Sequence, residues 1–219
     1  MKILLVSATK FEILPLLANF KKIHAGKNLS IYYFGKHTVD VLITGVGMTA
    51  AAFHLGKTLN KKYNLAVNAG VAGSFKKNIP LGTVVNVVTD CFGDLGAEDG
   101  EEFLTLKEMG LEKVTSYKLQ VTSVKLKKAI NSLPKVKAIT VNTAHGNPYS
   151  IKKVQKKFNP DIESMEGAAF VFSCDHEKIS CIQIRTVSNY VERRNKKKWE
   201  MNSAVRNLNL FLLEFMNKI

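Results

Sequence analysis

The feature that most restricts the fold of this chain is a series of short, continuous apolar runs, each bounded by polar residues. A run of this kind is typical of a β-strand buried on both faces, because a strand with one exposed face would alternate apolar and polar residues. Six runs have this character: 2–7, 39–44, 65–68, 84–89, 138–141 and 182–187. They predict a sheet that is covered on both sides.

Helical periodicity lies between these runs. It covers residues 49–60, 124–133, 165–177 and 202–216, and the last of these carries Val205, Leu208, Leu212 and Phe215 on one stripe. Strands that alternate with helices predict an α/β protein with helices on both faces of the sheet. No repeat, low-complexity segment or linker interrupts the pattern, so we expect a single domain over residues 1–219.

Composition agrees with a folded chain. The 219 residues are 46% hydrophobic and 23% charged, and a chain of this length buries roughly 70% of its unfolded surface without help from a metal or disulfide. Cys91, Cys174 and Cys181 have no C-x-x-C spacing and the five histidines are scattered, so no metal, disulfide or cofactor is predicted. The first apolar run is too short for a signal peptide, and no stretch approaches the roughly 20 apolar residues of a membrane span. We expect a cytoplasmic protein with no membrane partner.

The net charge of +14, from 32 basic and 18 acidic residues, raises the possibility of nucleic-acid binding. Arginine accounts for only four of the 32 basic residues, so 28 are lysines. Arginine is the residue that binds phosphates and bases bidentately, and no RNA-binding or helix-turn-helix pattern accompanies the charge. We interpret the lysines as a solvated surface and expect no nucleic-acid partner.

Polar and small residues follow the apolar runs, where the carboxyl ends of parallel strands place a ligand in an α/β sheet. The segments are 8–12, 45–49, 69–74, 142–149, 163–166 and 188–194. Most are rich in Gly, Ser, Asn or carboxylate side chains, and plain connecting loops do not require so many polar functional groups. We therefore look for the functional site among them.

Two of these segments are rich in glycine. Gly45-Val-Gly47-Met-Thr-Ala50 matches one form of the dinucleotide fingerprint, but no Asp or Glu occurs between Asp40 and Asp90 to bind the ribose of NAD. A tight strand-to-helix turn and a phosphate or ribose loop both stay open for it. The segment 68–74 could turn backbone N–H groups toward a ligand, but it lacks the lysine of a Walker loop, so we expect no NTPase.

The charged candidates each have a structural alternative. Glu12 fits a capping box with Thr9, which would begin a helix there. Pro15 lacks the N–H needed to continue such a helix. The place of Glu12 just past the first strand also suits a functional site. Glu163 and Glu166 could simply favour the N-terminus of the apolar helix that follows. Because that helix is too apolar to be exposed, we expect Glu166 to be buried with a partner such as a sugar diol or a cation.

Two residues of the last apolar run complete the set. Arg185 lies inside the run, where an unpaired guanidinium is costly, so it should hold a carboxylate or the backbone. Asn189 follows the run and carries a donor and an acceptor side by side, a pattern that matches the lactam edge of a purine.

Together these motifs resemble the nucleoside phosphorylase/nucleosidase superfamily over nearly the whole chain. The elements that carry the resemblance are Ser7-Ala-Thr-Lys-Phe-Glu12, Gly45-Val-Gly47, Asn68-Ala-Gly-Val-Ala-Gly73, Ser164-Met-Glu166-Gly-Ala-Ala and Arg185-Thr-Val-Ser-Asn189. Within the superfamily the sequence is most similar to the futalosine hydrolase family. The resemblance implies a three-layer α/β/α fold with a central mixed twisted sheet and hydrolysis of futalosine to hypoxanthine, a step of menaquinone biosynthesis.

The resemblance also implies roles for individual residues. Glu12 would activate the attacking water, Met165 would pack under the ribose, and Glu166 would bind its 2′- and 3′-hydroxyls, while Asn189 would act on the base. Further substrate contacts would come from Gly47, Val71, Ala72, Gly73, His145 and Ser188, and Arg185 would support the site. His145 stands where adenine-cleaving relatives place a stacking Phe, so it would replace that ring or face the 5′ group, unless it is structural. Superfamily members commonly pair, which makes a homodimer the expected assembly.

Asn189 departs from the methylthioadenosine/S-adenosylhomocysteine (MTA/SAH) nucleosidases, which carry Asp there to protonate an adenine. Asparagine cannot deliver a proton, but its amide matches the N1–H/O6 edge of a 6-oxopurine, so we expect a hypoxanthine-type base. Phosphorylases for 6-oxopurines also use Asn, but they need basic residues at a phosphate pocket, and segments 45–49 and 71–74 have none. Hydrolysis is therefore favoured over phosphorolysis. An MTA/SAH nucleosidase stays open as a further alternative, and a nucleoside-binding module without activity is disfavoured by the presence of both Glu12 and Glu166.

Overall fold

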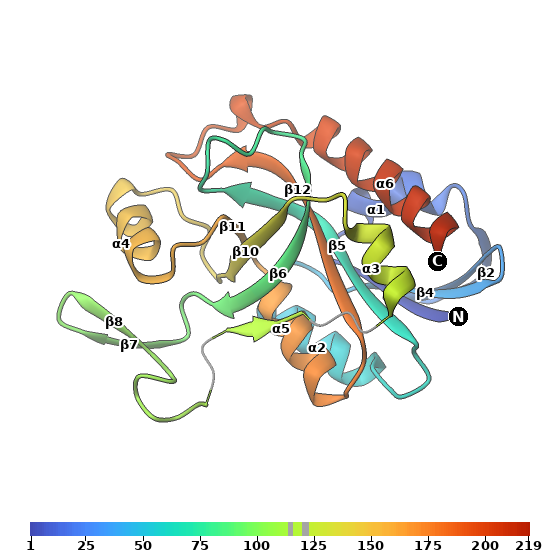
Figure 1. The fold of residues 1–219 in the computed structure, drawn as a ribbon, viewed down its shortest axis with the longest axis horizontal. Coiled ribbons are helices and arrows are strands. Elements are labelled where there is room, and N and C mark those ends of the chain that lie inside the picture. Colours follow the sequence, from blue (N-terminus) through green and yellow to red (C-terminus); the bar gives the residue numbers. More distant parts are fainter. Residues whose placement is uncertain (114–115, 120–122) are drawn as a thin grey trace.

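The structure is a computed structural model that describes residues 1–113, 116–119 and 123–219. Its strands are β1 (Lys2–Ser7), β2 (Lys21–Ala25), β3 (Leu29–Phe34), β4 (His37–Ile43), β5 (Leu65–Ser74), β6 (Val84–Phe92), β7 (Gly96–Asp99), β8 (Glu102–Thr105), β9 (Tyr117–Lys118), β10 (Lys135–Thr140), β11 (Ile162–Ser164) and β12 (Cys181–Tyr190). Its helices are α1 (Lys10–Leu17), α2 (Met48–Thr58), α3 (Val124–Ile130), α4 (Pro148–Phe158), α5 (Gly167–His176), the short η1 (Lys196–Lys198) and α6 (Met201–Lys218). Figure 1 shows their arrangement around one twisted sheet.

The central sheet is mixed and has the strand order β11-β10-β6-β12-β5-β1-β4-β3-β2, with β9 paired to β6. The middle of the sheet, β12-β5-β1-β4, is parallel, whereas β6 runs antiparallel to β12. β11 also pairs with β5, so that β5, β12, β6, β10 and β11 close into a ring. This closure brings the ends of β5, β11 and β12 together, and these strands carry much of the candidate site.

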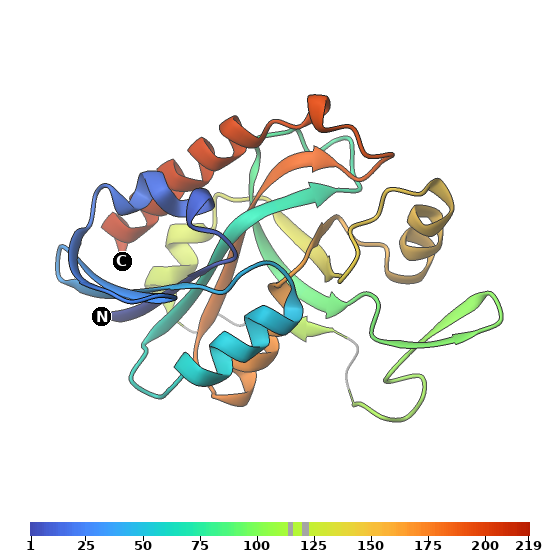
Figure 2. The same ribbon diagram turned by 180° about the vertical axis from the view of Figure 1, so that it is seen from behind.

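Helices cover both faces of the parallel strands, as predicted (Figures 1 and 2). On one face, α1, α3 and α6 bury an apolar cluster against β1, β5 and β12 that includes Ile13, Leu65 and Phe215. On the other face, α2 and α5 bury a second cluster that includes Leu55 and Phe170. Burial on both sides explains why these strands read as continuous apolar runs. The predicted three-layer α/β/α fold is confirmed.

Two predicted boundaries are wrong. Residues 69–74 and 188–190 were expected as loops, but β5 continues to Ser74 and β12 to Tyr190, paired with each other along this extension. The extensions are Gly-, Ser- and Asn-rich, so they lack the apolar signal of a strand, and ladder pairing within the ring supplies their stability instead. The sequence patterns also gave no account of the exposed β2–β3 hairpin or of the β7–β8 hairpin, which projects from the body in Figure 1.

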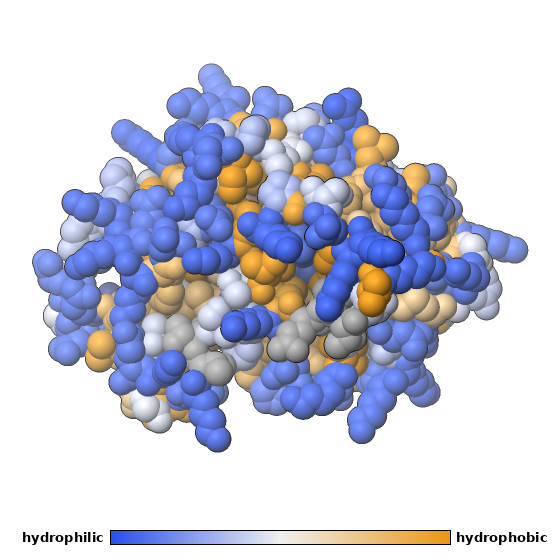
Figure 3. Space-filling model, viewed as in Figure 1, coloured by the Kyte–Doolittle hydropathy of each residue, from blue (hydrophilic) through white to orange (hydrophobic). Residues whose placement is uncertain are grey.

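The surface is polar in the way the lysine content predicts. Hydrophilic side chains are spread over the whole face seen in Figure 3, with apolar atoms visible between them near its centre. In the part of the chain that the structure describes, no helix is both long enough and apolar enough to span a membrane.

Candidate active site

A pocket of about 810 Å³ opens at the carboxyl ends of the parallel strands, where the sheet topology predicts a ligand. Nine of the eleven candidate residues line it: Glu12, Val71, Ala72, Gly73, His145, Met165, Glu166, Ser188 and Asn189. The other two, Gly47 and Arg185, lie behind Glu166 and contact its carboxylate. The topology thus gathers in one place residues that are spread over most of the sequence.

Glu12 is held by four hydrogen bonds at the start of α1. Its Oε2 accepts from the Thr9 N–H at 2.9 Å, the Thr9 hydroxyl at 2.9 Å and the Ser7 hydroxyl at 3.2 Å, while Oε1 accepts from the Val71 N–H at 3.0 Å. The predicted capping box is therefore present, and the same carboxylate faces the pocket. Oε1 accepts one bond and a carboxylate oxygen has two lone pairs, so Oε1 can accept a further donor such as water.

Glu166 and Arg185 form a buried ion pair beside Glu12. Arg185 Nη1 lies 3.6 Å from Glu166 Oε2, and Glu166 Oε1 accepts the Gly47 N–H at 3.0 Å. Arg185 is only 1% exposed, which confirms the prediction that it would hold a carboxylate. Gly47 has a φ of 99°, a left-handed conformation that favours glycine, so the Gly-x-Gly segment serves as the tight turn that presents this N–H.

The backbone of Gly70 passes unusually close to these charged groups. A Cβ at this position would lie 2.5 Å from Arg185 Nη1 and 2.8 Å from Glu12 Oε1. Only glycine allows the guanidinium and the Glu12 carboxylate to approach each other across β5. The glycine at position 70 is thus required by close packing of charged side chains, and it lies within the strand β5.

Burial controls the titration of the carboxylates near this end of the pocket. Loss of solvation raises the pKa of Glu166 above its usual value, and the Arg185 charge and the Gly47 N–H oppose that shift. Beneath this layer Asp90 is completely buried, and loss of solvation raises its pKa to about 6 although the Gln183 amide and the Thr140 hydroxyl donate to it. Asp90 does not line the pocket, so we assign it to the supporting structure.

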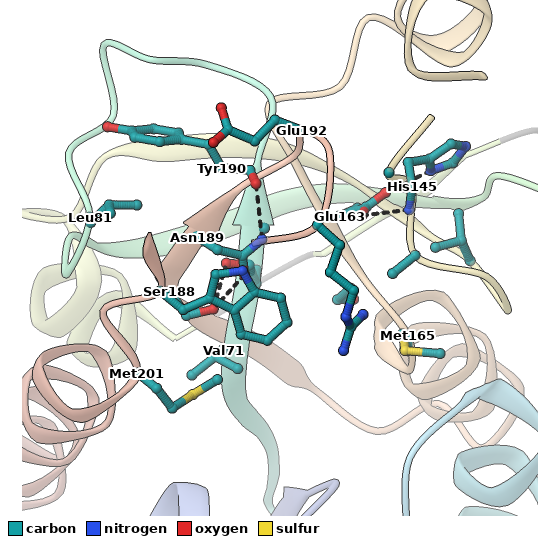
Figure 4. A pocket seen from close by; sticks show the side chains of 18 of the residues that line it. Val71, Leu81, His145, Glu163, Met165, Ser188, Asn189, Tyr190, Glu192 and Met201 are labelled. Carbon is teal, nitrogen blue, oxygen red and sulfur yellow. Dashed lines mark hydrogen bonds and ion pairs between the residues drawn. The ribbon is translucent and has the colours of Figure 1, made fainter. Parts of the chain in front are cut away.

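Asn189 lies at the other end of the pocket, at the end of β12. Its Oδ1 accepts the Ser188 hydroxyl at 2.9 Å, and its Nδ2 donates to the Tyr190 carbonyl at 3.1 Å. A Cβ on Gly73 would lie 3.2 Å from Asn189 Nδ2 and 3.6 Å from Glu163 Cγ. Asn189 and Glu163 therefore flank the same point of β5, and Figure 4 shows both on one side of the pocket, with Met165 and Met201 across from them.

His145 and Glu163 form a pair that the sequence motifs did not predict. The His145 N–H donates to Glu163 Oε1 at 3.0 Å, and His145 Nδ1 lies 2.7 Å from Glu163 Oε2 (Figure 4). The interpretation that Glu163 and Glu166 share the first turn of a helix is wrong, because Glu163 lies in β11 and α5 begins only at Gly167. Pairing with Glu163 holds His145 at the wall of the pocket, and its contact with the substrate stays a prediction.

The outer rim of the pocket is basic and comes from the segment after β12. Lys77 and Lys198 both pair with Glu192, at 2.7 and 3.4 Å. The guanidinium of Arg194 lies 5.0 Å from the centre of the Trp199 ring, and no carboxylate pairs with it among the residues that the structure describes. The sequence signal for this rim is the lone tryptophan at the end of a basic run, 193–199. From sequence alone such a run indicates a solvated charged surface, and only the fold places it beside the pocket.

No group of three or more His, Cys, Asp or Glu side chains suited to a metal occurs in residues 1–113, 116–119 and 123–219. The oxygens of the pocket are instead bound by N–H groups, hydroxyls and a guanidinium. This donor set suits an organic ligand with hydroxyl and amide groups.

The fold and pocket define the class of this protein as a three-layer α/β/α protein of the nucleoside phosphorylase/nucleosidase type, with a pocket at the strand ends. The chain belongs to the phosphorylase superfamily, whose family model matches residues 2–217.

The chain is also similar to proteins of named activity. The chain is 27% identical to a futalosine hydrolase of Streptomyces coelicolor, over 76% of this chain and 73% of that protein. It is 26% identical to an aminodeoxyfutalosine nucleosidase of Campylobacter jejuni over the full length of both. The solved structure of a Helicobacter pylori futalosine hydrolase matches with a TM-score of 0.85 at 16% identity, over 100% of this chain and 98% of that one, which establishes the fold.

Proposed function

We propose that this protein is a nucleosidase that hydrolyses the N-glycosidic bond of futalosine, releasing hypoxanthine and dehypoxanthine futalosine in menaquinone biosynthesis. The observation that carries the proposal is the placement of two buried carboxylates, Glu12 and Glu166, at one end of the pocket and the amide of Asn189 at the other. The similarity to futalosine hydrolases supports this substrate.

Glu12 is the general base in this proposal. Four hydrogen bonds fix its carboxylate, and Oε1 has a lone pair left for the attacking water. As the C–N bond breaks, the ribose gains positive charge, and carboxylates fixed beside it stabilise that charge. Glu12 then takes the proton from the water as it attacks the anomeric carbon.

Glu166 holds the ribose. Its carboxylate has the Gly47 N–H on one oxygen and the Arg185 guanidinium beside the other, so it is held in one orientation toward the pocket. A vicinal diol donates two hydrogen bonds to such a carboxylate, and hydrogen bonds to a charged group are the strong ones. Met165 lies directly before it on the pocket wall and supplies an apolar surface for the sugar.

Asn189 selects the base. Its amide offers one donor and one acceptor to a 6-oxopurine, which presents N1–H and O6 on adjacent atoms. The nearby Glu163 carboxylate accepts hydrogen bonds only, so it repels the unprotonated N1 of a 6-aminopurine. Asparagine has no proton to give, so the leaving base must depart without an acid at this position.

Water is the proposed nucleophile because, among the described residues, the end of the pocket that holds Glu12 and Glu166 (the inner end) offers phosphate no cation other than Arg185. Segments 45–49 and 71–74 contain no basic residue, and Arg185 is engaged by Glu166. One arginine of the rim, Arg194, instead lies at the outer end, over Trp199. There it can attract the carboxylate that futalosine carries on its 5′ substituent.

The decisive experiment is incubation of the purified protein with futalosine, inosine, aminodeoxyfutalosine and methylthioadenosine, with and without phosphate, followed by chromatography of the released bases. We expect phosphate-independent release of hypoxanthine, fastest from futalosine. Ribose 1-phosphate formation would reassign the protein to the phosphorylases, and preferential release of adenine would reassign it to the aminodeoxyfutalosine or MTA/SAH nucleosidases. Release of no base from any of the four would leave only a nucleoside-binding module. The homodimer and the cytoplasmic location stay predictions.

A further inference from the structure

Helix α1, which carries Glu12, is bridged by a side chain from the other end of the sequence. In an uninterrupted α-helix the N–H of Leu16 donates to the carbonyl of Glu12, four residues earlier. Here the Leu16 N–H donates to Oδ1 of Asn209 at 2.8 Å, and Nδ2 of Asn209 donates to the Glu12 carbonyl at 2.8 Å. The Asn209 amide thus bonds to the same two backbone groups that the helix would pair.

Pro15 explains why the helix is open at this turn. It lies inside α1, where it has no N–H for the carbonyl of residue 11 and its ring crowds that carbonyl. A helix opened by proline commonly has another polar group inserted into its hydrogen-bond ladder. Asn209 is that group, and it enters immediately beside the proline.

Burial of the Asn209 side chain costs folding free energy unless its amide is hydrogen-bonded. Asn209 is 4% exposed and lies on the buried side of α6, next to the apolar cluster that contains Leu208 and Leu212. Its amide is hydrogen-bonded, because Nδ2 also donates to the Val205 carbonyl at 2.6 Å. Two of its three bonds go to α1, one of them to the backbone of the proposed general base.

We infer that Asn209 is a positioning residue for Glu12, an inference that rests on the proposed function. The carboxylate of Glu12 is fixed by Ser7, Thr9 and Val71, and its backbone carbonyl is fixed by Asn209, so Glu12 is held at both ends. Asn209 does not line the pocket, so it acts on the substrate only through Glu12. A displacement of about 1 Å in a reacting group can cost about 100-fold in rate, which makes the backbone anchor a catalytic requirement.

The test compares Asn209→Leu with Asn207→Leu. Asn207 lies on the same helix and donates to the Gly82 carbonyl at 2.8 Å, so its replacement removes a side-chain bond of the same kind without touching α1. We expect Asn209→Leu to lower kcat at least about tenfold, with KM within about threefold of wild type. Asn207→Leu should lower stability without this split. Asn209→Asp, which keeps the acceptor for Leu16 and loses the donor to Glu12, serves if the leucine variant does not fold.

A double-mutant cycle separates positioning from a general loss of structure. If Asn209 acts through Glu12, Asn209→Leu changes the residual rate of Glu12→Gln by less than about threefold, because the group it positions is already lost. An equal loss of rate in both backgrounds, or a rise in KM with kcat unchanged, overturns the inference.

A readout that does not depend on turnover keeps the inference separate from the proposed function. The ¹³C carboxyl resonance of Glu12, assigned by its disappearance in Glu12→Gln, should shift in Asn209→Leu and stay at its wild-type position in Asn207→Leu. If the wild type cleaves no nucleoside, the proposed function fails and this resonance alone decides whether Asn209 positions Glu12. An unchanged Glu12 resonance in Asn209→Leu overturns the inference.

Discussion

The two ends of the pocket are built in different ways. At the inner end, Glu12, Glu166 and Arg185 are buried, and the two carboxylates accept hydrogen bonds from backbone N–H groups of other strands and loops. At the outer end, the Asn189 side chain bonds, among the described residues, only to its sequence neighbours, and Arg193 and Arg194 are exposed on the segment after β12. Rigidly held carboxylates suit a chemical step that is the same for many substrates. Side chains that bond only to near neighbours can be substituted without disturbing the core. We therefore expect the inner end to control rate and the outer end to control substrate choice.

The largest expected effect is at Glu12. Glu12→Gln keeps the shape and several hydrogen bonds of the side chain but removes the base, so kcat should fall about 1,000-fold, within the range for general base catalysis. KM should change little, because the ribose contacts of Glu166 persist. Single-turnover rates with futalosine measure the loss, and the outer carboxylate variant Glu192→Gln, expected within about threefold of wild type, is its matched control. A Glu12→Gln rate equal to the Glu192→Gln rate contradicts the assignment.

Glu166→Gln should lower kcat/KM about 100-fold, because it removes a charged acceptor for the ribose diol and leaves Arg185 buried without its carboxylate. The measurement is the ratio of kcat/KM for inosine to that for 2′-deoxyinosine. Wild type should prefer the ribonucleoside strongly, and the variant should lose most of that preference. A preserved ratio would show that another group reads the 2′-hydroxyl. Since the pKa of Glu166 is raised, wild-type activity should also fall at a higher pH on the acid side than an exposed carboxylate would give.

The inner end was more predictable from sequence than the outer end, for a physical reason. Glu166 and Arg185 sit in apolar surroundings in the sequence, and a buried charge must have a partner, so the need of each for a partner follows from local pattern and desolvation. That they pair with each other is a finding of the structure. The parallel central strands and their helices follow from periodicity in the same way. Most of the geometry at the inner end is therefore set by signals that lie within short stretches of the chain.

The outer end and the ring closure depend on contacts between distant residues that no local pattern reveals. Glu163 has the sequence pattern of a helix-capping acid, and only the pairing of β11 with β10 and β5 carries it to His145. Asn209 gave a weak signal, as an amide beside an apolar stripe, but its two partners on α1 lie 193 and 197 residues away in the sequence. Glycine-rich strands such as 69–74 are hidden because their stability comes from the ladder and not from apolar side chains.

Asp90 tests whether the layer beneath the inner end tolerates the loss of a charge. Its pKa is raised from 3.8 to about 6 by burial, so the folded state holds a proton that the unfolded state releases, and stability falls as pH rises from about 4 to about 6. A shift of about two pKa units corresponds to roughly 3 kcal/mol. Asp90→Asn should remove most of this decline, because asparagine does not titrate. The new amide nitrogen has an acceptor available, since Oε1 of Gln183 has no partner in the described structure and can turn toward it.

Urea denaturation at pH 4.5 and pH 8 measures this effect. The variant should match wild type within about 1 kcal/mol at the lower pH and exceed it by up to roughly 3 kcal/mol at the higher pH. Cys91→Ser, at the neighbouring buried position, is the control for a change in the same strand without a change of charge near neutral pH. A variant less stable than wild type at pH 8 would mean that the Asp90 charge stabilises the fold.

Asn189→Asp tests substrate choice at the outer end. The change replaces the amide donor with a second acceptor that can carry a proton, so the ratio of kcat/KM for futalosine over aminodeoxyfutalosine should fall about tenfold, the equivalent of about one hydrogen bond. The rate constants for both substrates are measured in one assay by base release. The carboxylate keeps the Ser188 hydroxyl as a donor but loses the bond to the Tyr190 carbonyl, so the free energy of unfolding should fall by about 1 kcal/mol. A substrate ratio that does not move contradicts the role of Asn189 in reading the base.

Arg194→Met should give the smallest effect and the sharpest contrast with the inner end. The variant keeps an apolar stem against Trp199 but loses the charge, and exposed charge pairs contribute about 0.2–1 kcal/mol. KM for futalosine should therefore rise about two- to fivefold with kcat unchanged, and the difference from wild type should shrink at about 0.5 M salt as the charges are screened. Inosine, which has no acidic 5′ substituent, is the internal control, and its KM should stay at the wild-type value. If KM rises equally for both nucleosides, Arg194 shapes the pocket wall and does not attract the acid group, and the rim then contributes packing instead of electrostatic selection.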